Sequence, residues 1–443
     1  MVGALAVMIG LGLLAYGCSD DSKNGPNDTN DAGTGGTGGS AGTSGTGGSG
    51  GADAGAGGVG GAGGGNPWDR EGFNGKFHTC FYNSDGDCPV VDLDLDGNQM
   101  HLMTGYPINR KGKINLDQTE PMTSVDANFG FGTQNFIGHD VEGYGLVHPP
   151  QLVKLSNGNF LVPFSEDMAW KSGIALIDQT GYVPRWVLDP KFGVDPIGIL
   201  AGLDKDGRIY LSVTDRTTED GKIMSYGIKP NGDLNEADAS TPISTSGKKP
   251  STIADLGNGR MAVLNTKGLF GASIDIIDTV QGVVINNTSL GPNVEAVPLY
   301  ELSLTADKKY AIVAGGEQGE RTTIYIVNLE TATLESSLDL KDMSYCEEIR
   351  GIDIDENMNA YISTVGGTDG DEVLIIDFTT PEKVKRKGAV FVGYDLGAIA
   401  VHESGIVYVV ATDRYWEAEG TAETNGMKRW SHIVAFDPLQ VTN

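Results

Sequence analysis

A repeat of about fifty residues constrains this chain more than any other feature. Between Gln151 and Asp437, six segments follow one plan: an apolar strand, a tight polar turn, a second β-rich strand, a variable loop, and a third strand that ends in Asp or Asn. The turns are centred on Gly158, Gly207, Gly259, Lys308, Met358 and Gly405, at spacings of 49, 52, 49, 50 and 47 residues. Short strands joined by such turns form hairpins. Their repetition at this period is typical of the four-stranded blades of a β-propeller.

The sequence therefore predicts an all-β propeller over residues 68–443, with about seven blades and six as the alternative. Residues 66–150 have room for one blade before the first repeat. The last repeat lacks an obvious fourth strand, and propellers commonly close by pairing their two chain ends, which hides sheet edges. We therefore expect an N-terminal strand, from Phe77–Phe81 or Gln99–Thr104, to complete a blade.

The first 17 residues are apolar and uncharged, and Cys18 follows them directly. This run is too short for a membrane span and is typical of a signal peptide. Residues 14–18 (LAYGC) resemble a bacterial lipobox, which implies lipid attachment at Cys18 and export to the outer membrane, facing the periplasm or the cell surface. No basic residue precedes the apolar core, so we expect the true start to lie upstream of Met1. Cleavage by an ordinary signal peptidase, with Cys18 incidental, is the alternative.

Residues 18–67 are predicted to be a flexible tether without secondary structure. Residues 33–65 hold 19 glycines among Ala, Ser and Thr, and such a composition buries too little apolar area to fold. About fifty residues of this kind have a root-mean-square reach of roughly 40 Å. The tether can therefore hold the domain clear of a membrane.

Charge and cysteine content exclude some functions. The chain has 59 acidic and 31 basic residues and a net charge of −28, which argues against nucleic acid as a partner because its phosphates would be repelled. Cys80 and Cys88 bracket a turn-rich heptapeptide and are predicted to form a small disulfide loop in an oxidising compartment. Cys346 is left as a buried thiol, since its acidic neighbours Glu347 and Glu348 disfavour a reactive thiolate.

Acidic runs offer one candidate metal site. Asp92, Asp94 and Asp96 alternate before Gly97 as at the start of a calcium loop, but Met103 stands where an EF-hand loop needs its bidentate Glu. The same residues fit a hairpin, so a hairpin and a Ca²⁺ site both stay open. A similar run, residues 353–359, is predicted to be structural. The six histidines show no metal-binding spacing, and no cofactor is required by the sequence.

One set of blade loops is rich in cations and tryptophan. These loops join the second and third strands of a blade or lead into the first strand, so they share one face of a propeller. We call their candidate ligand-binding residues the predicted rim: Trp170, Lys171, Arg216, Arg350, Arg414, Trp416, Arg429 and Trp430. The longest predicted loop is Arg414–Ser431. Arg and Trp together suit an anionic or aromatic ligand, through bidentate hydrogen bonds and stacking.

The repeat over Gln151–Asp437 resembles NHL-like and YVTN-like propellers, which implies the architecture and not the function. With Cys18 and the predicted rim, the chain also resembles propeller lipoproteins that accompany outer-membrane siderophore receptors. That resemblance implies a non-catalytic ligand-binding lipoprotein in iron uptake, with a ferric siderophore as ligand and an outer-membrane receptor as partner. Two alternatives stay open: a lactonase-like propeller hydrolase or lyase, and a surface scaffold for protein–protein interaction.

Overall fold

The chain divides into two compact units, Met1–Ala54 and Gly55–Asn443, and the computed structural model describes residues of the second. The described residues are 73–78, 90–104, 111–116, 153–155, 158–166, 171–177, 185–187, 192–200, 208–229, 234–235, 241–268, 271–297, 302–317, 320–341, 346–366, 371–393, 396–416 and 427–441. Over these residues the regular elements are all β-strands, and no helix has the length and apolar character to cross a membrane.

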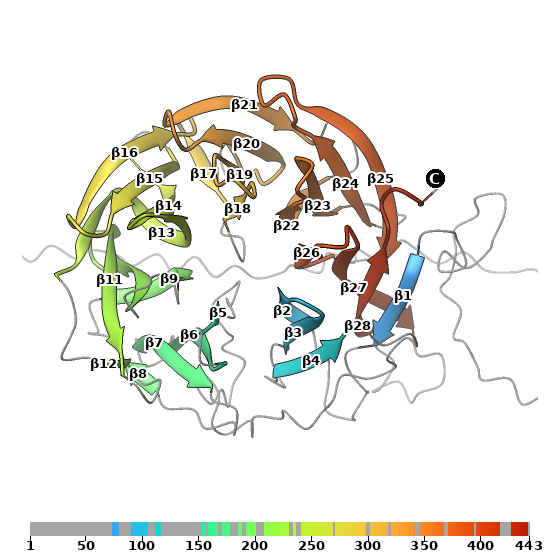
Figure 1. Ribbon diagram of the computed structural model, residues 1–443, viewed down its shortest axis with the longest axis horizontal. Coiled ribbons are helices and arrows are strands. Elements are labelled where there is room, and N and C mark those ends of the chain that lie inside the picture. Colours follow the sequence, from blue (N-terminus) through green and yellow to red (C-terminus); the bar gives the residue numbers. More distant parts are fainter. Residues whose placement is uncertain are drawn as a thin grey trace, which may run out of the picture. The chain divides into compact units, whose positions relative to one another are not determined.

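The described strands pair into six antiparallel sheets (Figure 1). The first two sheets contain β2 (Val90–Asp96), β3 (Gln99–Thr104) and β4 (Lys111–Asn115), and β5 (Val153–Lys154), β6 (Phe160–Glu166), β7 (Lys171–Ile177) and β8 (Arg185–Val187). The third and largest sheet contains β9 (Phe192–Leu200), β10 (Arg208–Asp215), β11 (Asp220–Ile228), β12 (Leu234–Asn235), β13 (Ile243–Gly257), β14 (Arg260–Lys267), β15 (Ser273–Asp278) and β16 (Val283–Ser289). The last three contain β17 (Val294–Ala296), β18 (Ser303–Leu304), β19 (Tyr310–Glu317), β20 (Thr323–Asn328) and β21 (Thr333–Asp339); β22 (Glu348–Ile354), β23 (Asn359–Val365), β24 (Asp371–Asp377) and β25 (Lys385–Gly393); and β1 (Phe73–His78), β26 (Ile399–Val401), β27 (Val407–Trp416) and β28 (Met427–Phe436).

The eight-stranded sheet is two blades joined through β13. The first residues of β13 pair with β11, and from Lys248 onward the same strand pairs with β14. Between the two parts, Lys249 has a φ of 50°, in the left-handed region, which interrupts the extended backbone of the strand. β13 therefore contains the last strand of one blade and the first strand of the next. The architecture is an all-β propeller, as the repeat predicted, and the count of seven blades stays a prediction.

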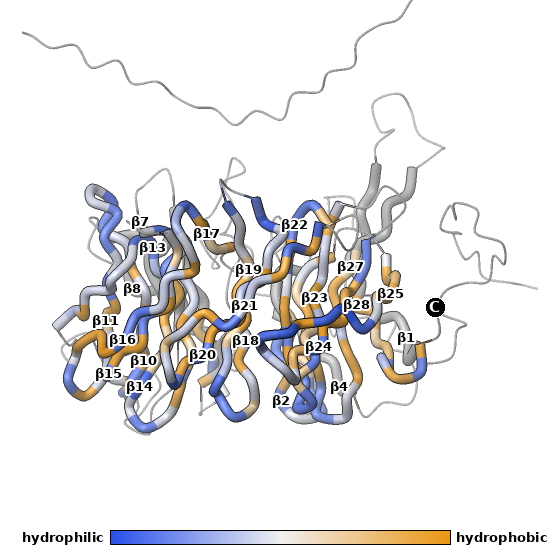
Figure 2. Tube along the Cα trace, turned by 90° about the horizontal axis from the view of Figure 1, so that it is seen from above, coloured by the Kyte–Doolittle hydropathy of each residue, from blue (hydrophilic) through white to orange (hydrophobic). Residues whose placement is uncertain are grey.

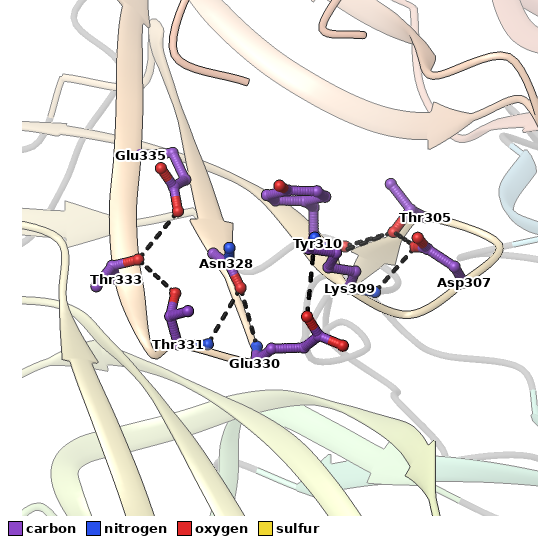
Figure 3. Close-up of polar contacts among 9 residues, drawn as sticks. All are labelled: Thr305, Asp307, Lys309, Tyr310, Asn328, Glu330, Thr331, Thr333 and Glu335. Carbon is purple, nitrogen blue, oxygen red and sulfur yellow. Dashed lines mark hydrogen bonds and ion pairs between the residues drawn. The ribbon is translucent and has the colours of Figure 1, made fainter. Parts of the chain in front are cut away.

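Side-chain hydrogen bonds explain why the third strand of a repeat ends in Asp or Asn. The described residues of this kind are Asp278, Asn328, Asp377 and Asp437. In Asn328, the side-chain oxygen accepts hydrogen bonds from the backbone N–H groups of Glu330 and Thr331, at 3.0 and 3.1 Å (Figure 3). The other three residues also accept a backbone N–H two residues later. A short polar side chain that bonds its own backbone in this way specifies the turn.

The first turn of each repeat also has a local cause. Five of the six predicted turn centres have a positive φ, namely Gly158, Gly259, Lys308, Met358 and Gly405, with values of 83°, 70°, 58°, 60° and 87°. Gly207 lies outside the described residues. Glycine adopts this conformation without steric cost. Glycine occupies four of the six turn centres, and there it marks the hairpin that opens the blade.

Apolar residues of neighbouring blades form the core. Figure 2 shows apolar residues along the strands and hydrophilic residues at the turns. Between the β17–β21 and β22–β25 blades, one cluster contains the fully buried Ile324, Ile362 and Phe378. Burying each side chain of this size contributes about 1.5–3 kcal/mol. The alternation of β-branched residues in the repeat thus supplies each blade with an apolar face for its neighbours.

Two contacts close the propeller between its chain ends. β1 pairs with β28, with Phe77 opposite Ile433, and completes a four-stranded sheet with β26 and β27. The prediction that an N-terminal strand completes the last blade is therefore confirmed, but this strand is Phe73–His78 and shares only Phe77 and His78 with the predicted Phe77–Phe81, whereas Gln99–Thr104 forms β3 of another sheet. That sheet packs on the last blade, where Leu102 and Met100 join Val410 in one buried cluster.

Candidate functional site

The predicted rim residues lie on several separate elements. Arg216 is half-buried in the turn after β10, Lys171 begins β7, and Arg350 lies in β22. Trp170 lies outside the described residues. The remaining four residues, Arg414, Trp416, Arg429 and Trp430, belong to β27 and β28.

Glutamates that were not predicted as site residues pair with cations at the strand ends and loops of the described blades. The pairs are Lys249 with Glu219 at 3.3 Å, Lys267 with Glu295 at 2.9 Å, Lys341 with Glu320 at 2.7 Å, and Arg350 with Glu348 at 2.7 Å. Exposed pairs of this kind contribute little to stability, but they neutralise much of the local field. The charges of these four cations are therefore largely balanced by neighbouring carboxylates.

Glu348 is shared between two guanidinium groups of neighbouring blades. Its Oε1 contacts Nη1 of Arg321, and its Oε2 lies 2.7 Å from Nη2 of Arg350. The backbone N–H of Ile349 donates to the carbonyl of Arg321 at 2.8 Å, which holds the two blades together beside the ion pairs. Glu348 and Arg350 are two residues apart in β22, but the ladder is irregular between Ile349 and Gly351, so simple strand alternation does not predict their pairing. The contact with Arg321 depends on how the two blades pack.

The prediction of a long loop over Arg414–Ser431 was wrong. β27 runs to Trp416 and β28 begins at Met427, so only residues 417–426 connect them, and these lie outside the described residues. The ladder continues from Val407 opposite Phe436 to Trp416 opposite Met427. Polar residues in this stretch suggested a loop, but Thr, Tyr and Trp favour extended backbone where a partner strand is available.

The outer part of this hairpin pairs only with itself among the described ladders. β26 pairs with β27 as far as Val409, and β1 pairs with β28 as far as His432. The next five pairs, from Thr412–Ser431 to Trp416–Met427, have no further strand partner in those ladders. We call residues 412–416 and 427–431 the arm.

The register of the arm places like charges opposite one another. Arg414 pairs with Arg429, and the next pair on the same face of the ladder is Trp416 with Met427. On the other face, Asp413 pairs with Trp430 and Tyr415 pairs with Lys428. Four of the eight predicted rim residues are thus brought together in the arm, two of them as a directly opposed arginine pair.

The acidic run at residues 92–96 forms the hairpin that was one of its two interpretations. Asp92, Asp94 and Asp96 lie on β2, and Asp96 pairs with Gln99 across a tight turn. His101 of β3 lies 4.0 Å from Asp96. In the described part of the chain, no group of three or more His, Cys, Asp or Glu residues could hold a metal ion. Calcium binding at these residues stays a prediction.

The second acidic run is structural, as predicted. Asp355 accepts backbone N–H groups of Asn357 and Asn359 at 2.9 and 2.8 Å, and the hydroxyl of Tyr361 donates to its other oxygen at 3.1 Å. Asp353 accepts the backbone N–H of Val401 from the next blade at 2.6 Å. Burial raises the pKa of the Asp353 carboxyl to about 6. Both carboxylates therefore serve turns and blade contacts.

Cys346 is a buried thiol, as predicted. Its side chain lies in the cluster between the β17–β21 and β22–β25 blades and is 3% exposed. Burial, followed by the nearby Asp339, raises the pKa of the Cys346 thiol to about 12. A thiol with this pKa is not a nucleophile at neutral pH. Cys18, Cys80 and Cys88 lie outside the described residues.

Comparisons with known proteins support the fold. No protein-family profile and no curated protein sequence matches the chain. A protein of Lactobacillus plantarum, known from its crystal structure, is similar with a TM-score of 0.51 at 14% identity, over 75% of this chain and 95% of that one. The WD40 repeats of RRP9 are similar with a TM-score of 0.49 at 8% identity, over 80% of this chain and 96% of that one. At such identities a likeness concerns fold alone. The chain is an all-β protein with a β-propeller fold.

Proposed function

We propose that this chain is an exported, lipid-anchored propeller that binds an anionic ligand through the arm, without catalysing a reaction on it. The observation that carries the proposal is the register of β27 and β28, which sets Arg414 opposite Arg429. Cys18 is proposed as the lipid anchor in the outer membrane, and residues 18–67 as the tether.

The arginine pair costs stability unless an anion is present. Like charges at directly opposed positions destabilise an antiparallel pair, and no other strand pairs with these residues in the described ladders. Natural proteins break such local rules mainly at functional sites. A carboxylate, phosphate or catecholate oxygen between the two guanidinium groups would relieve the repulsion and accept charge-assisted hydrogen bonds.

The arm also differs in charge from the rest of the chain. It holds three cationic residues, Arg414, Lys428 and Arg429, and one anionic residue, Asp413, in a chain with a net charge of −28. Four described cations elsewhere, Lys249, Lys267, Lys341 and Arg350, are paired with glutamates. An anion approaching this side therefore meets its most favourable local charge at the arm.

The aromatic residues of the arm narrow the ligand class. Trp416 follows the arginine pair on the same face, and Tyr415 and Trp430 occupy the other face. Aromatic rings stack on planar ligands and arginine binds their anionic oxygens. Ferric catecholate siderophores combine both properties, so we propose one of them as the ligand, with an outer-membrane receptor as partner in iron uptake.

A fluorescence titration tests this function. The purified full chain is titrated with a ferric catecholate siderophore, and quenching of tryptophan fluorescence reports binding. Each of Arg414→Ala and Arg429→Ala is expected to weaken binding about 10- to 100-fold, since each removes a charge-assisted hydrogen bond. The matched control is Lys385→Ala, which removes one exposed cation from β25 and should change affinity by less than about twofold. Unquenched fluorescence, or an equal loss in the control, would refute the proposal.

A further inference from the structure

The outer strand of one blade departs from the others in its exposed residues. Among the described residues, three of the five exposed large hydrophobic side chains come from the β15–β16 turn and β16: Val280 at 84%, Val283 at 44% and Ile285 at 42%. We call these three residues the apolar strip. Isolated exposed hydrophobic residues are common, but three within six positions form a patch that needs an explanation.

The same bulge in three blades shows what is unusual about Ile285. In β16, β21 and β25 the third residue of the strand has no partner in the ladder with the preceding strand and forms a β-bulge; these residues are Ile285, Glu335 and Lys387. Glu335 accepts a hydrogen bond from Thr333 at 3.0 Å (Figure 3), and Lys387 donates one to Asn359 at 3.1 Å. The residue at this position is thus charged and hydrogen-bonded in two blades, whereas in the third blade it is an exposed isoleucine.

The edge of β16 also lacks the usual protection of outer strands. It is the end strand of its sheet and pairs with β15 alone in the described ladders, at the periphery in Figure 1. Charged residues at sheet edges prevent unwanted pairing. Among the described end strands at the periphery, only β16 and the two-residue β12 have none, whereas the others contain Lys76, Lys111, Lys113, Arg185, Glu335, Asp339, Lys385, Arg386 or Lys387.

We propose that β16 forms a two-fold contact with β16 of a second copy of this chain. In a two-fold contact each surface meets itself, so a charged edge would be set against its own charge. Strands such as β25, with Lys385, Arg386 and Lys387, are excluded from self-pairing for this reason. The apolar strip is uncharged and aliphatic, and a second copy presents the same chemistry to it.

Size and charge set the strength of this contact. Three side chains from one strand and the turn before it make a small interface, typical of a weak and reversible dimer. Two chains with a net charge of −28 repel one another at long range, and salt screens that repulsion. The dimer is therefore expected to strengthen as the salt concentration rises, unlike a contact held by ion pairs.

Sedimentation equilibrium of the full chain tests the proposal. A dimer with a Kd of about 10–100 µM is expected, as for other small interfaces. Its Kd should fall at least about threefold between about 0.05 and 0.5 M NaCl. Ile285→Lys, which copies Lys387 of the β22–β25 blade, should weaken the dimer at least about tenfold without changing the unfolding temperature.

Leu439→Lys is the matched control, because Leu439 is 86% exposed and lies outside the apolar strip. It should leave the dimer unchanged. A chain that stays monomeric to about 200 µM at high salt would overturn the proposal, and the strip would then have to serve a different protein. An equal loss of dimer in Leu439→Lys and Ile285→Lys would overturn it too.

Discussion

His402 donates a hydrogen bond from Nε2 to the backbone carbonyl of Gly97, 305 residues earlier in the chain, at 3.1 Å. The backbone N–H of Ser404 donates to Nδ1 of the same ring at 3.1 Å, so Nδ1 is the acceptor and Nε2 carries the proton. This contact joins the first turn of the last blade to the β2–β3 turn, beside the cluster that closes the propeller.

Removing this imidazole should loosen the closure. His402→Ala is expected to lower the free energy of unfolding by about 1 kcal/mol, the typical net value of one hydrogen bond with its packing. Urea unfolding followed by circular dichroism measures the change. Glu403→Ala, at the exposed neighbouring residue, is the control and should have no effect. An equal effect in both variants would mean that His402 does not support closure.

Two glycine-to-alanine substitutions separate the effect of backbone strain at the repeated turn from the effect of an added methyl group. A Cβ added at Gly405 or at Gly388 meets nothing within 4 Å, but only Gly405 has a positive φ, of 87°. Gly405→Ala should therefore lower stability by about 1–2 kcal/mol through backbone strain. Gly388→Ala should be neutral or slightly stabilising. Thermal unfolding of both variants decides the point, and equal shifts would contradict the proposed role of the left-handed turn.

Stability should depend on the ionisation of Asp353. Burial raises the pKa of this carboxyl from 3.8 to about 6, so the folded state favours the neutral form more than the unfolded state does. The stability that the protonated group contributes is present below about pH 4 and is lost as pH rises through about 6. The loss amounts to at most about 3 kcal/mol.

Asp353→Asn tests whether stability falls as Asp353 ionises. Its amide oxygen can still accept the N–H of Val401, but the side chain does not ionise. The variant should match the parent near pH 4 and become progressively more stable than it up to about pH 7. Urea unfolding across this range gives the difference. A difference that does not change with pH would show that the carboxyl is not the group responsible.

Cys346 should be inert in the folded protein. Its thiol is 3% exposed and burial raises its pKa to about 12, so almost none is thiolate at pH 8. A chromogenic disulfide reagent should find no reaction at this residue until the chain is unfolded. The Cys346→Ser variant shows which part of the absorbance change comes from the Cys346 thiol. Rapid reaction in the native state would contradict the buried position.

Local features of the fold could be predicted from sequence because their causes are local. Gly158 and Gly405 marked turns that need a positive φ, and Asp278 and Asn328 marked strand ends that their own side chains cap. The pairing of β1 with β28 was predicted only from the missing fourth strand, since nothing in residues 73–78 indicates a partner that lies 354 to 363 residues later in the chain.

The candidate site could be predicted only in part. Arg414 and Arg429 were found by composition, but their opposed register depends on strand pairing beyond Val410, where the alternation of apolar residues ends. The ion pair of Arg321 with Glu348 joins two blades and depends on how they pack. Composition thus indicated a cationic face, whereas the fold shows where its charge is balanced.

A double-mutant cycle on Arg414 and Arg429 tests the central claim most directly. If both guanidinium groups bind one anion, the losses of siderophore affinity in Arg414→Ala and Arg429→Ala should not add. The double variant should then differ from the sum of the single variants by at least about 1 kcal/mol. Fluorescence titration of the four proteins gives this coupling energy. Strictly additive losses, or affinities that do not change, would contradict a shared anion site on the arm.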